Sequence, residues 1–535
     1  MNQHNRIILI CTLAGLAILA IQYLLPWLMT RLARYLDRKD PFGRDQLGFP
    51  QERQQKITGY SLHLTATYMD HGRKRRSWIN FINPRRGLLI LGSPGCGKTW
   101  FIIQPLIDQL TRKGCALFVF DFKYPNLSRY TYACFLQNRA NYPANIQFYC
   151  INFSDLRRTH RCNVLDPVTL KWPSDALGVA RTILLSLNRT WAHRQGDFFI
   201  ESPINFLGAV IWYLKQYKEG IYCTLPHAIE LAQLPYDQLF DLLGSVSELQ
   251  AIVTTFREAR DNKTHEMLDG QIASARIPLG RLSSPDLYYI LSGNDLSLDI
   301  NDLEAPKILC LGGSAARQEA LAPVLSLFID RLNRRLNQAG RYPCGMVCDE
   351  FATVRAYSMV ELVATARSNN IIPILALQEL NQLKTQYAES EAQALMNMAG
   401  NIVCGQVGGE TAKWMSEKFP RIMEDRITTT QNEQGSSESR TRSWEHSMDQ
   451  ATIANLSSGE FVGVTADEPG APQAYKVFHA RIDPPQDPPT LPDLPLVHDV
   501  DDATIRQHFD QIRRDIVDLV NYELSHLPGS YGRLK

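Results

Sequence analysis

The amino-acid sequence predicts an α/β fold, in which a parallel β-sheet carries helices and a further block of helices is inserted. Three observations indicate this class. Short apolar segments of strand length recur along the chain, a glycine-rich loop lies between one of them and a helix, and residues 170–297 are helical in pattern. At 535 residues the chain is long enough for two or three folded units.

The composition excludes some broad classes of function. The chain has 56 basic and 55 acidic residues, so it is not a general polyanion binder, and any nucleic-acid contact requires a local basic surface. Its 11 cysteines include no CxxC pair and no Cys/His spacing typical of a metal site. Neither zinc nor a disulfide framework is therefore predicted, and a reducing, cytoplasmic location fits.

The N-terminal segment has the properties of a membrane anchor. Residues 7–29 contain no charged side chain and as a helix would span roughly 35 Å, enough for a hydrocarbon core of about 30 Å. Tyr23 and Trp27 lie near one end, where amphipathic rings prefer the interface. Basic residues follow directly: Arg31, Arg34, Arg38 and Lys39. We expect one transmembrane helix within residues 1–30 and the bulk of the chain in the cytoplasm. The alternative is a cleaved signal peptide, for which the sequence offers only a poor cleavage site.

The segment after this anchor is strongly basic. Residues 31–86 contain 13 basic and 5 acidic side chains, including the run Arg73-Lys74-Arg75-Arg76. Two interpretations are open: a solvated linker beside anionic lipid, or a surface that faces nucleic acid. Proximity to the predicted anchor favours the linker.

The first strand of the predicted sheet, residues 88–91, leads into a glycine-rich loop, a helix over residues 100–113 and a second buried strand over residues 115–121. The loop reads GSPGCGKT and consists of Gly92, Ser93, Pro94, Gly95, Cys96, Gly97, Lys98 and Thr99. A GxxxxGK[ST] motif between a strand and a helix is the context in which such a loop holds nucleotide phosphates.

Each residue type of this loop has a chemical reason to be there. The three glycines, Gly92, Gly95 and Gly97, let backbone N–H groups converge on a phosphate at the N-terminus of a helix. Lys98 would neutralise the β- and γ-phosphate oxygens, and Thr99 would offer its hydroxyl to Mg²⁺. We therefore predict binding of ATP with Mg²⁺.

Two acidic residues follow one of the later strands. These strands are predicted over residues 307–311, 345–348, 372–377 and 401–405. Asp349 and Glu350 come directly after the second of them. Asp349 is expected to complete the Mg²⁺ shell, and Glu350 to polarise the attacking water. The alternative, an ordinary polar strand end, is weakened by the phosphate loop in the same chain.

Arg367 and Gln378 are further candidates for the catalytic site. Gln378 follows the strand over residues 372–377, where it would sense the γ-phosphate. Arg367 ends a predicted helix over residues 359–368, and two roles are open for it: an arginine finger reaching a neighbour's nucleotide, or a surface salt bridge. Asp121 and Lys123 end the second strand, where a structural role is favoured.

These elements divide the chain into five parts. The predicted parts are an anchor (1–30), a basic linker (31–86), an α/β nucleotide-binding domain in two segments (87–169 and 298–480), an inserted all-α domain (170–297), and a proline-rich spacer with a C-terminal helix (481–535). That helix has an apolar stripe and is expected to dock on its own chain: Ile505, Phe509, Ile512, Ile516 and Leu519. Residues 428–447 are polar and are predicted to form a loop.

With these motifs in place, the chain resembles the coupling proteins of conjugative type IV secretion systems, the TraG/TraD class of membrane-anchored DNA-pumping ATPases. The resemblance rests on five stretches: NPRRG before GSPGCGKT, FDFKY at 120–124, GDFFIESP at 196–203, CDEFAT at 348–353, and ATARSNN at 364–370 with LQELNQL at 377–383. It covers about residues 87–480.

The resemblance carries expectations about fold, partners and site. It implies a RecA-like motor domain, an all-α domain facing the cytoplasm, and a homo-hexameric ring around a channel for single-stranded DNA. It also implies recruitment of a relaxase–DNA complex to the secretion channel at the inner membrane. Lys98, Thr99, Asp349 and Glu350 match the Walker positions, and Gln378 and Arg367 match the sensor glutamine and the candidate finger.

One departure from the class is visible in the sequence. Many members have two membrane helices around a small periplasmic loop, whereas one membrane helix is predicted here. We therefore expect that contact with the secretion channel depends on a separate small membrane protein. Two rival functions remain at this stage: a related FtsK/HerA-type motor that pumps chromosomal DNA or exports protein, and a membrane-tethered, nucleotide-dependent scaffold that barely hydrolyses. Asp349-Glu350 argues against the scaffold, and the helical insertion argues against chromosome pumps.

Overall fold

The computed structural model describes residues 49–70, 72–188, 190–191, 196–261, 265–432, 435–468 and 470–526. The anchor predicted within residues 1–30 lies outside these ranges. Within them, no single helix is long and apolar enough to span a membrane, although one bent pair, Tyr236–Leu243 with Ser247–Arg260, passes on length and composition.

A single sheet of eleven strands organises the described chain, in the order β2-β1-β13-β12-β9-β3-β8-β7-β4-β6-β5. From β9 to β5 all neighbouring strands are parallel. These strands are β3 (Leu88–Leu91), β4 (Ala116–Asp121), β5 (Gln147–Ile151), β6 (Lys307–Gly312), β7 (Cys344–Cys348), β8 (Ile371–Leu377) and β9 (Asn401–Cys404). The predicted α/β fold with a parallel sheet is confirmed. The apolar pattern missed one parallel strand, β5, because its first residue is exposed and its second is only partly buried.

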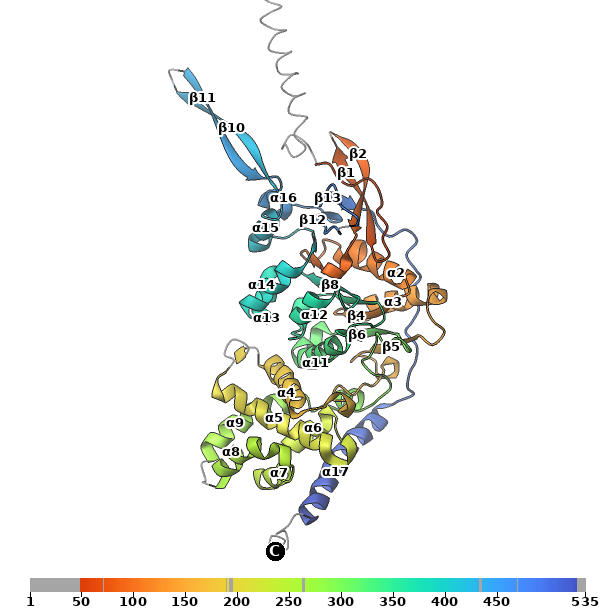
Figure 1. Cartoon of the computed structure of the whole chain (residues 1–535), viewed down its shortest axis with the longest axis vertical. Coiled ribbons are helices and arrows are strands. Elements are labelled where there is room, and N and C mark those ends of the chain that lie inside the picture. The colour runs from red at the N-terminus through yellow and green to blue at the C-terminus, as the bar shows by residue number, and fades with distance from the viewer. Residues whose placement is uncertain are drawn as a thin grey trace, which may run out of the picture.

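Helices cover both faces of the parallel sheet, as Figure 1 shows. Leu88 and Ile90 of β3 pack toward α2 (Gln104–Arg112) and α3 (Asn126–Gln137), whereas Leu89 and Leu91 pack toward the other face. That other face carries α11 (Gln318–Leu336), α12 (Met359–Thr365), α13 (Leu380–Gln386) and α14 (Glu389–Met398). Strands buried on both faces need continuous apolar sequence, which is why the sequence revealed them.

The basic segment at residues 31–86 was predicted as a linker, and for residues 62–81 this prediction is wrong. Those residues form the antiparallel strands β1 (Leu62–Asp70) and β2 (Arg73–Phe81), which join the sheet through β13 (Val477–Ile482) and β12 (Glu460–Val464). Leu62, Leu64, Ala66 and Tyr68 are buried at every second position. This alternation of period two is the signature of a strand, and the high charge of the segment concealed it.

Between β5 and β6 the chain forms the helices of the predicted insertion. They are α4 (Pro173–Leu187), α5 (Phe198–Gln216), α6 (Leu225–Ala232), α7 (Tyr236–Leu243), α8 (Gln250–Asp261), α9 (His265–Gly280) and α10 (Pro285–Leu291). They gather at the end of the molecule opposite the β1–β2 hairpin (Figure 1). The α5 helix is capped at its N-terminus by Asp197, whose carboxylate accepts a hydrogen bond from the Phe199 N–H.

The polar segment at residues 428–447 is not a loop. The chain there forms a two-stranded antiparallel ribbon of β10 (Arg421–Asn432) and β11 (Gly435–His446), between α15 (Gly409–Ser416) and α16 (Gln450–Ala454). Within the described chain this ribbon pairs with no other strand, and in Figure 1 it projects from the body. A ribbon that adds to no larger sheet needs no alternating apolar residues, which explains why its polar sequence predicted a loop.

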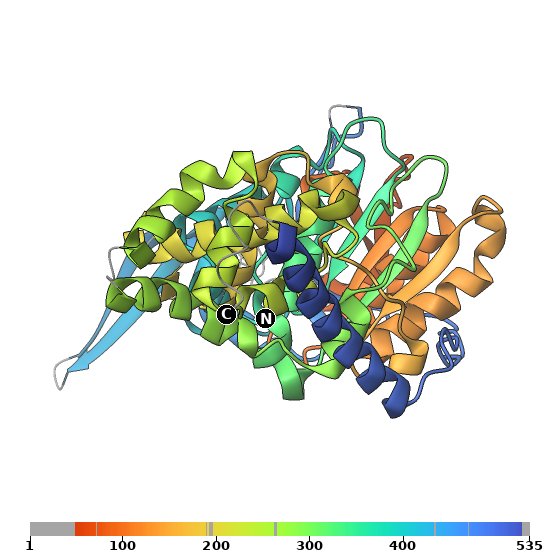
Figure 2. The ribbon, with the colours of Figure 1, turned by 90° about the horizontal axis from the view of Figure 1, so that it is seen from below.

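The C-terminal segment crosses from the sheet to the inserted helices. Arg129 of α3 donates hydrogen bonds to the carbonyls of Leu491 and Pro492 in the proline-rich spacer. Beyond the spacer, α17 (Asp502–His526) packs on α6, α7 and α10, and Figure 2 shows it lying across the helices. Its buried residues are Ile505, Ile512, Ile516, Leu519 and Val520. The apolar stripe therefore docks on its own chain, as expected.

Candidate functional site

The glycine-rich loop begins where β3 ends, in the middle of the parallel sheet. Leu91, the last residue of β3, lies opposite Leu377 of β8 and Cys404 of β9. Gly95 and Gly97 have φ angles of 87° and 95°, a region that residues with a Cβ rarely adopt. A Cβ on Gly97 would also lie 2.5 Å from the Phe101 ring. The local sequence therefore gives the loop its tight course into the following helical turn, Thr99–Ile103.

Contacts from distant parts of the chain brace this loop. The Ser93 N–H donates to the Gln406 carbonyl at 2.7 Å. The Ser458 hydroxyl donates to the Gly95 carbonyl at 3.2 Å, and the Gly459 N–H donates to the Cys96 carbonyl at 3.1 Å. The segment ending in Ser458 and Gly459 was not predicted from the sequence, because only the fold brings it to the loop.

Lys98 lies at the centre of the loop, with 7% of its surface exposed. Its ammonium group donates a hydrogen bond to the Gly92 carbonyl, so the side chain folds back over the loop. A buried ammonium without a carboxylate partner among the described residues is poised to receive an anion. Thr99 follows it at the start of the helical turn.

Two carboxylates from the end of β7 meet this loop. Asp349 and Glu350 are buried, with 7% and 6% of their surfaces exposed. Burial, the Glu350 carboxylate and Asp121 raise the pKa of Asp349 to about 6, whereas the Lys98 and Lys123 ammonium groups act in the opposite direction. This mutual influence indicates that the predicted residues gather at the carboxyl edge of the sheet.

Glu350 and Gln378 form the most specific contact of the site. The Gln378 side-chain amide donates to Glu350 Oε2 at 2.9 Å. The other carboxylate oxygen, Oε1, is buried and has no hydrogen-bond partner in the described structure. Glu350 also has a left-handed backbone, with φ 58° and ψ 51°, which is costly for a residue with a side chain. The Glu350 Oε1 atom can therefore accept a hydrogen bond from a ligand, such as a water molecule.

Arg367 lies elsewhere. It follows α12, which ends at Thr365 rather than at the predicted residue 368, and it precedes β8, whereas Gln378 follows β8. Because β8 has seven residues, the two ends are separated by about 20 Å. Arg367 is therefore at the amino edge of the parallel strands and cannot reach a nucleotide held by Lys98 of its own chain.

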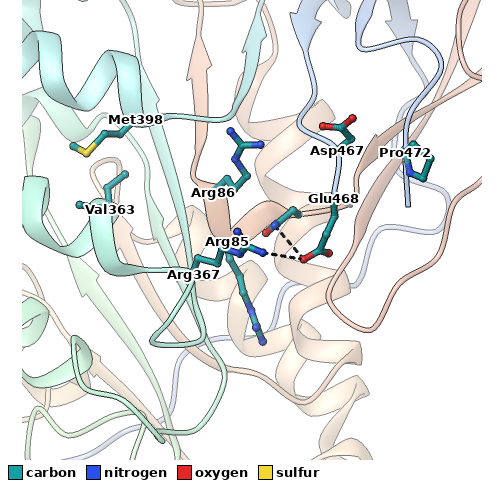
Figure 3. Close-up of a pocket in the computed structure, with 10 residues that line it drawn as sticks. Arg85, Arg86, Val363, Arg367, Met398, Asp467, Glu468 and Pro472 are labelled. Atoms are coloured by element: carbon teal, nitrogen blue, oxygen red, sulfur yellow. Dashed lines mark hydrogen bonds and ion pairs between the residues drawn. The ribbon is translucent and has the colours of Figure 1, made fainter. Parts of the chain in front are cut away.

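The surroundings of Arg367 form a cleft of about 750 Å³ at that edge, shown in Figure 3. Its guanidinium is 3.6 Å from Glu468, which also accepts a hydrogen bond from Asn83. The Arg367 side chain is 63% exposed, and Arg86 lines the same cleft. Both roles left open for Arg367 are compatible with this position, since it has an ion-pair partner and remains accessible to a neighbouring molecule.

Asp121 has a structural role, as the sequence favoured. It is 1% exposed and accepts hydrogen bonds from the Ser128 N–H and hydroxyl, at 2.8 and 2.9 Å, so it holds the first turn of α3. Lys123 is exposed.

The site residues fit a nucleoside triphosphate with Mg²⁺. The loop supplies N–H groups and an ammonium for phosphates, and Thr99 and Asp349 supply oxygen, the ligand type that Mg²⁺ prefers. Among the described residues no group of three or more His, Cys, Asp or Glu side chains forms a complete metal site.

One family model matches the part of the chain that contains Asp349, Glu350 and Gln378. Residues 343–459 match the family model described as the TraM recognition site of TraD and TraG. This part of the chain is TraG/TraD-like. The match begins just before β7, contains Asp349, Glu350, Arg367 and Gln378, and ends at Gly459, which braces the phosphate loop. The resemblance to the TraG/TraD class that the motifs indicated is confirmed.

The fold is also similar to solved structures of a conjugative coupling protein. The unbound monoclinic form of the bacterial conjugative coupling protein TrwBdeltaN70 is 17% identical, with 76% of this chain and 87% of that chain covered and a TM-score of 0.58. The plasmid coupling protein TrwB in complex with ADP and Mg²⁺ is 17% identical, with 78% and 88% covered and a TM-score of 0.56. No curated protein sequence matches the chain.

Proposed function

We propose that this chain is a membrane-anchored, RecA-like ATPase that couples a relaxase–DNA complex to a type IV secretion channel and drives single-stranded DNA transfer during conjugation. The observation that carries the proposal is the convergence of the phosphate loop with Asp349, Glu350 and Gln378 at one sheet edge, in a chain that matches the TraD and TraG family model. The solved coupling protein that binds ADP and Mg²⁺ supports the choice of ATP and Mg²⁺.

In this proposal the loop binds and orients the triphosphate. Backbone N–H groups of the loop would donate hydrogen bonds to the phosphates, and the Lys98 ammonium would leave the Gly92 carbonyl to neutralise the β- and γ-phosphate oxygens. The Thr99 hydroxyl and the Asp349 carboxylate would hold Mg²⁺, and the bound ion would neutralise part of the negative charge of the phosphates.

Glu350 then orients the attacking water. Its free Oε1 accepts a hydrogen bond from the water, and the carboxylate takes the proton as the water oxygen bonds to the γ-phosphorus and the bond from that phosphorus to the bridging oxygen breaks, which releases ADP and phosphate. Gln378 keeps the other oxygen, Oε2, in place, so that one edge of the carboxylate faces the substrate. The amide is at the same edge as the γ-phosphate and is available to sense it.

The contact between Gln378 and Glu350 leads to a specific prediction. The Gln378→Ala variant is expected to lower kcat for ATP by roughly 10- to 100-fold with little change in KM, because Glu350 loses its orienting partner while the phosphate loop is untouched. Steady-state ATPase assays measure both constants. Glu379→Ala, at the exposed neighbouring position, is the matched control and should behave as wild type. A rise in KM with unchanged kcat would place Gln378 in nucleotide binding instead.

The DNA-coupling role is tested by stimulation and by transfer. Single-stranded DNA is expected to raise the ATP turnover of the full-length protein, and the stimulation should fade as salt rises, because phosphate contacts release counterions. In donor cells that lack the gene, the wild-type chain should restore transfer of relaxase-bound DNA and the Lys98→Ala variant should not. ATP turnover that responds to a protein cargo but not to DNA would instead favour a protein-export motor.

The proposed anchor has its own test. Full-length protein is expected in the inner-membrane fraction and should require detergent for extraction, because residues 7–29 are long and apolar enough to span the bilayer. Fractionation after carbonate washing measures this. Recovery of full-length protein in the soluble fraction without detergent would contradict the anchor. The homo-hexamer and the channel contacts belong to the same proposal and follow from the class that the chain resembles.

A further inference from the structure

The run Arg73-Lys74-Arg75-Arg76 has no part in the nucleotide site, yet the fold presents all four residues to solvent. They form the first half of β2 and are exposed, whereas the second half of β2 is mostly buried. In the register of the hairpin, Arg73 lies opposite Asp70, Lys74 opposite Met69 and Arg76 opposite Thr67.

The charges of this hairpin tip are largely uncompensated. Asp70 forms ion pairs with Arg53 at 2.9 Å and with Arg75 at 2.8 Å. In the part of the chain that the structure describes, Arg73, Lys74 and Arg76 form no ion pair. Among the described residues, five cations therefore surround the Asp70 carboxylate: Arg53, Arg73, Lys74, Arg75 and Arg76.

Two of the unpaired cations share one face. Successive residues of a strand point to opposite faces, so Lys74 and Arg76 lie on the same side as the residues opposite them, Met69 and Thr67. Met69 is 40% exposed, and Trp78, the next residue of β2 on this face, is half-buried against the His63 ring. We call Met69, Lys74 and Arg76, with Arg73 at the turn, the basic hairpin face.

The position of the hairpin restricts its partners. It lies at the end of the molecule opposite α7, α8 and α17 (Figure 1). The described chain begins at Phe49 and runs beside β2, where the Trp78 N–H donates to the Glu52 carbonyl at 2.8 Å. The predicted membrane span ends at Met29, so 19 residues lie between it and Phe49. The hairpin is therefore tethered close to the membrane surface that the anchor enters.

We propose that the basic hairpin face binds anionic phospholipid headgroups at the cytoplasmic surface of the membrane. This inference rests on the anchor in the proposed function. Cations near a membrane surface are attracted by acidic lipids, and the exposed Met69 side chain can enter the interfacial region beside them. Lipid is favoured over single-stranded nucleic acid because the exposed apolar neighbour on this face is a methionine, whereas single-strand binding uses exposed aromatic rings for base stacking. Such a contact would hold the ATPase domain in one orientation to the bilayer.

The test uses the full-length protein in lipid nanodiscs. A fluorophore is placed at Met69→Cys in a Cys11→Ser background, because the ten cysteines of the described residues are buried and Cys11 lies outside those residues. Its quenching by nitroxide-headgroup lipid is measured in phosphatidylcholine nanodiscs with and without phosphatidylglycerol. Quenching is expected with phosphatidylglycerol and should disappear at high salt, because exposed charges are screened. A label at Tyr522→Cys on α17, also exposed, should show no quenching.

Charge variants complete the experiment. Lys74→Gln with Arg76→Gln is expected to lower the equilibrium constant for lipid contact by roughly 30-fold, since each cation contributes about fivefold. Arg506→Gln with Arg514→Gln removes the same charge from exposed positions on α17 and should leave quenching unchanged. ATP turnover in detergent should be at the wild-type level in both. Equal quenching in neutral and anionic nanodiscs, or a label that responds to single-stranded DNA instead, would overturn the lipid site. Failure of the protein to insert into nanodiscs would instead overturn the anchor.

Discussion

Lys98→Ala is expected to lower ATP turnover by a factor of at least about 10²–10³, with the fold retained. The Lys98 ammonium is the cation inside the phosphate loop, and its hydrogen bond goes to the Gly92 carbonyl rather than to a carboxylate of the core. Truncation therefore removes the countercharge of the γ-phosphate without opening a large cavity. ATPase assays measure the loss, and thermal unfolding should show a Tm close to that of the wild type.

Glu350→Gln separates binding from hydrolysis at the same site. Glutamine keeps the shape of the side chain but cannot accept the proton of the attacking water, so turnover should fall by about 10²–10⁴-fold. ATP should still bind with near wild-type affinity, since the phosphate loop and Thr99 are intact, and equilibrium binding of a fluorescent ATP analogue measures this. Near-normal turnover in Glu350→Gln would show that another group activates the water.

Arg367→Ala is expected to lower ATP turnover by about 10³–10⁵-fold if the arginine completes a neighbour's site. Arg367 cannot serve its own nucleotide, since β8 separates it from Gln378. Its ion pair with Glu468 is exposed and is worth at most about 1 kcal/mol, so loss of that pair alone explains no large effect. Glu468→Gln breaks the same pair and keeps the arginine, so it should retain activity.

Mixing two inactive variants tests whether the finger acts between subunits. Arg367→Ala subunits keep an intact phosphate loop and Glu350, whereas Glu350→Gln subunits keep an intact finger. In mixed rings an intact site sometimes meets an intact finger, so part of the activity should return and should respond to single-stranded DNA. Mixed rings that are no more active than either variant alone would assign Arg367 to its salt bridge with Glu468.

The parallel sheet and the core of the site could be predicted from local sequence. Strands such as β3 and β8 are buried on both faces, so each is a continuous apolar run whose end is easily located. Gly95, Gly97, Lys98 and Thr99 function through their own backbone and side chains within one loop, and the motif therefore contains most of its own geometry. Asp349 and Glu350 were predicted as site residues because they follow a strand directly in a chain that also has a phosphate loop.

Other features depend on contacts between residues far apart in the chain. β1 and β2 form an antiparallel edge where charged residues occupy exposed positions, so composition suggested a linker although the backbone joins the sheet through β13. The β10–β11 ribbon has no sheet partner in the described chain beyond its own two strands, and its polar sequence gave no strand signal.

The sequence by itself determined which nucleotide chemistry is predicted for this protein, because phosphate binding needs a few residue types at short, fixed spacing. Only the tertiary structure decided how those residues are used. It places the Gln378 amide 2.9 Å from Glu350, braces the loop with Ser458, and puts Arg367 at the opposite edge of the sheet. Each of these is a contact or a separation between segments distant in sequence, and it arises from the strand order and from burial of the apolar faces, which no local pattern contains.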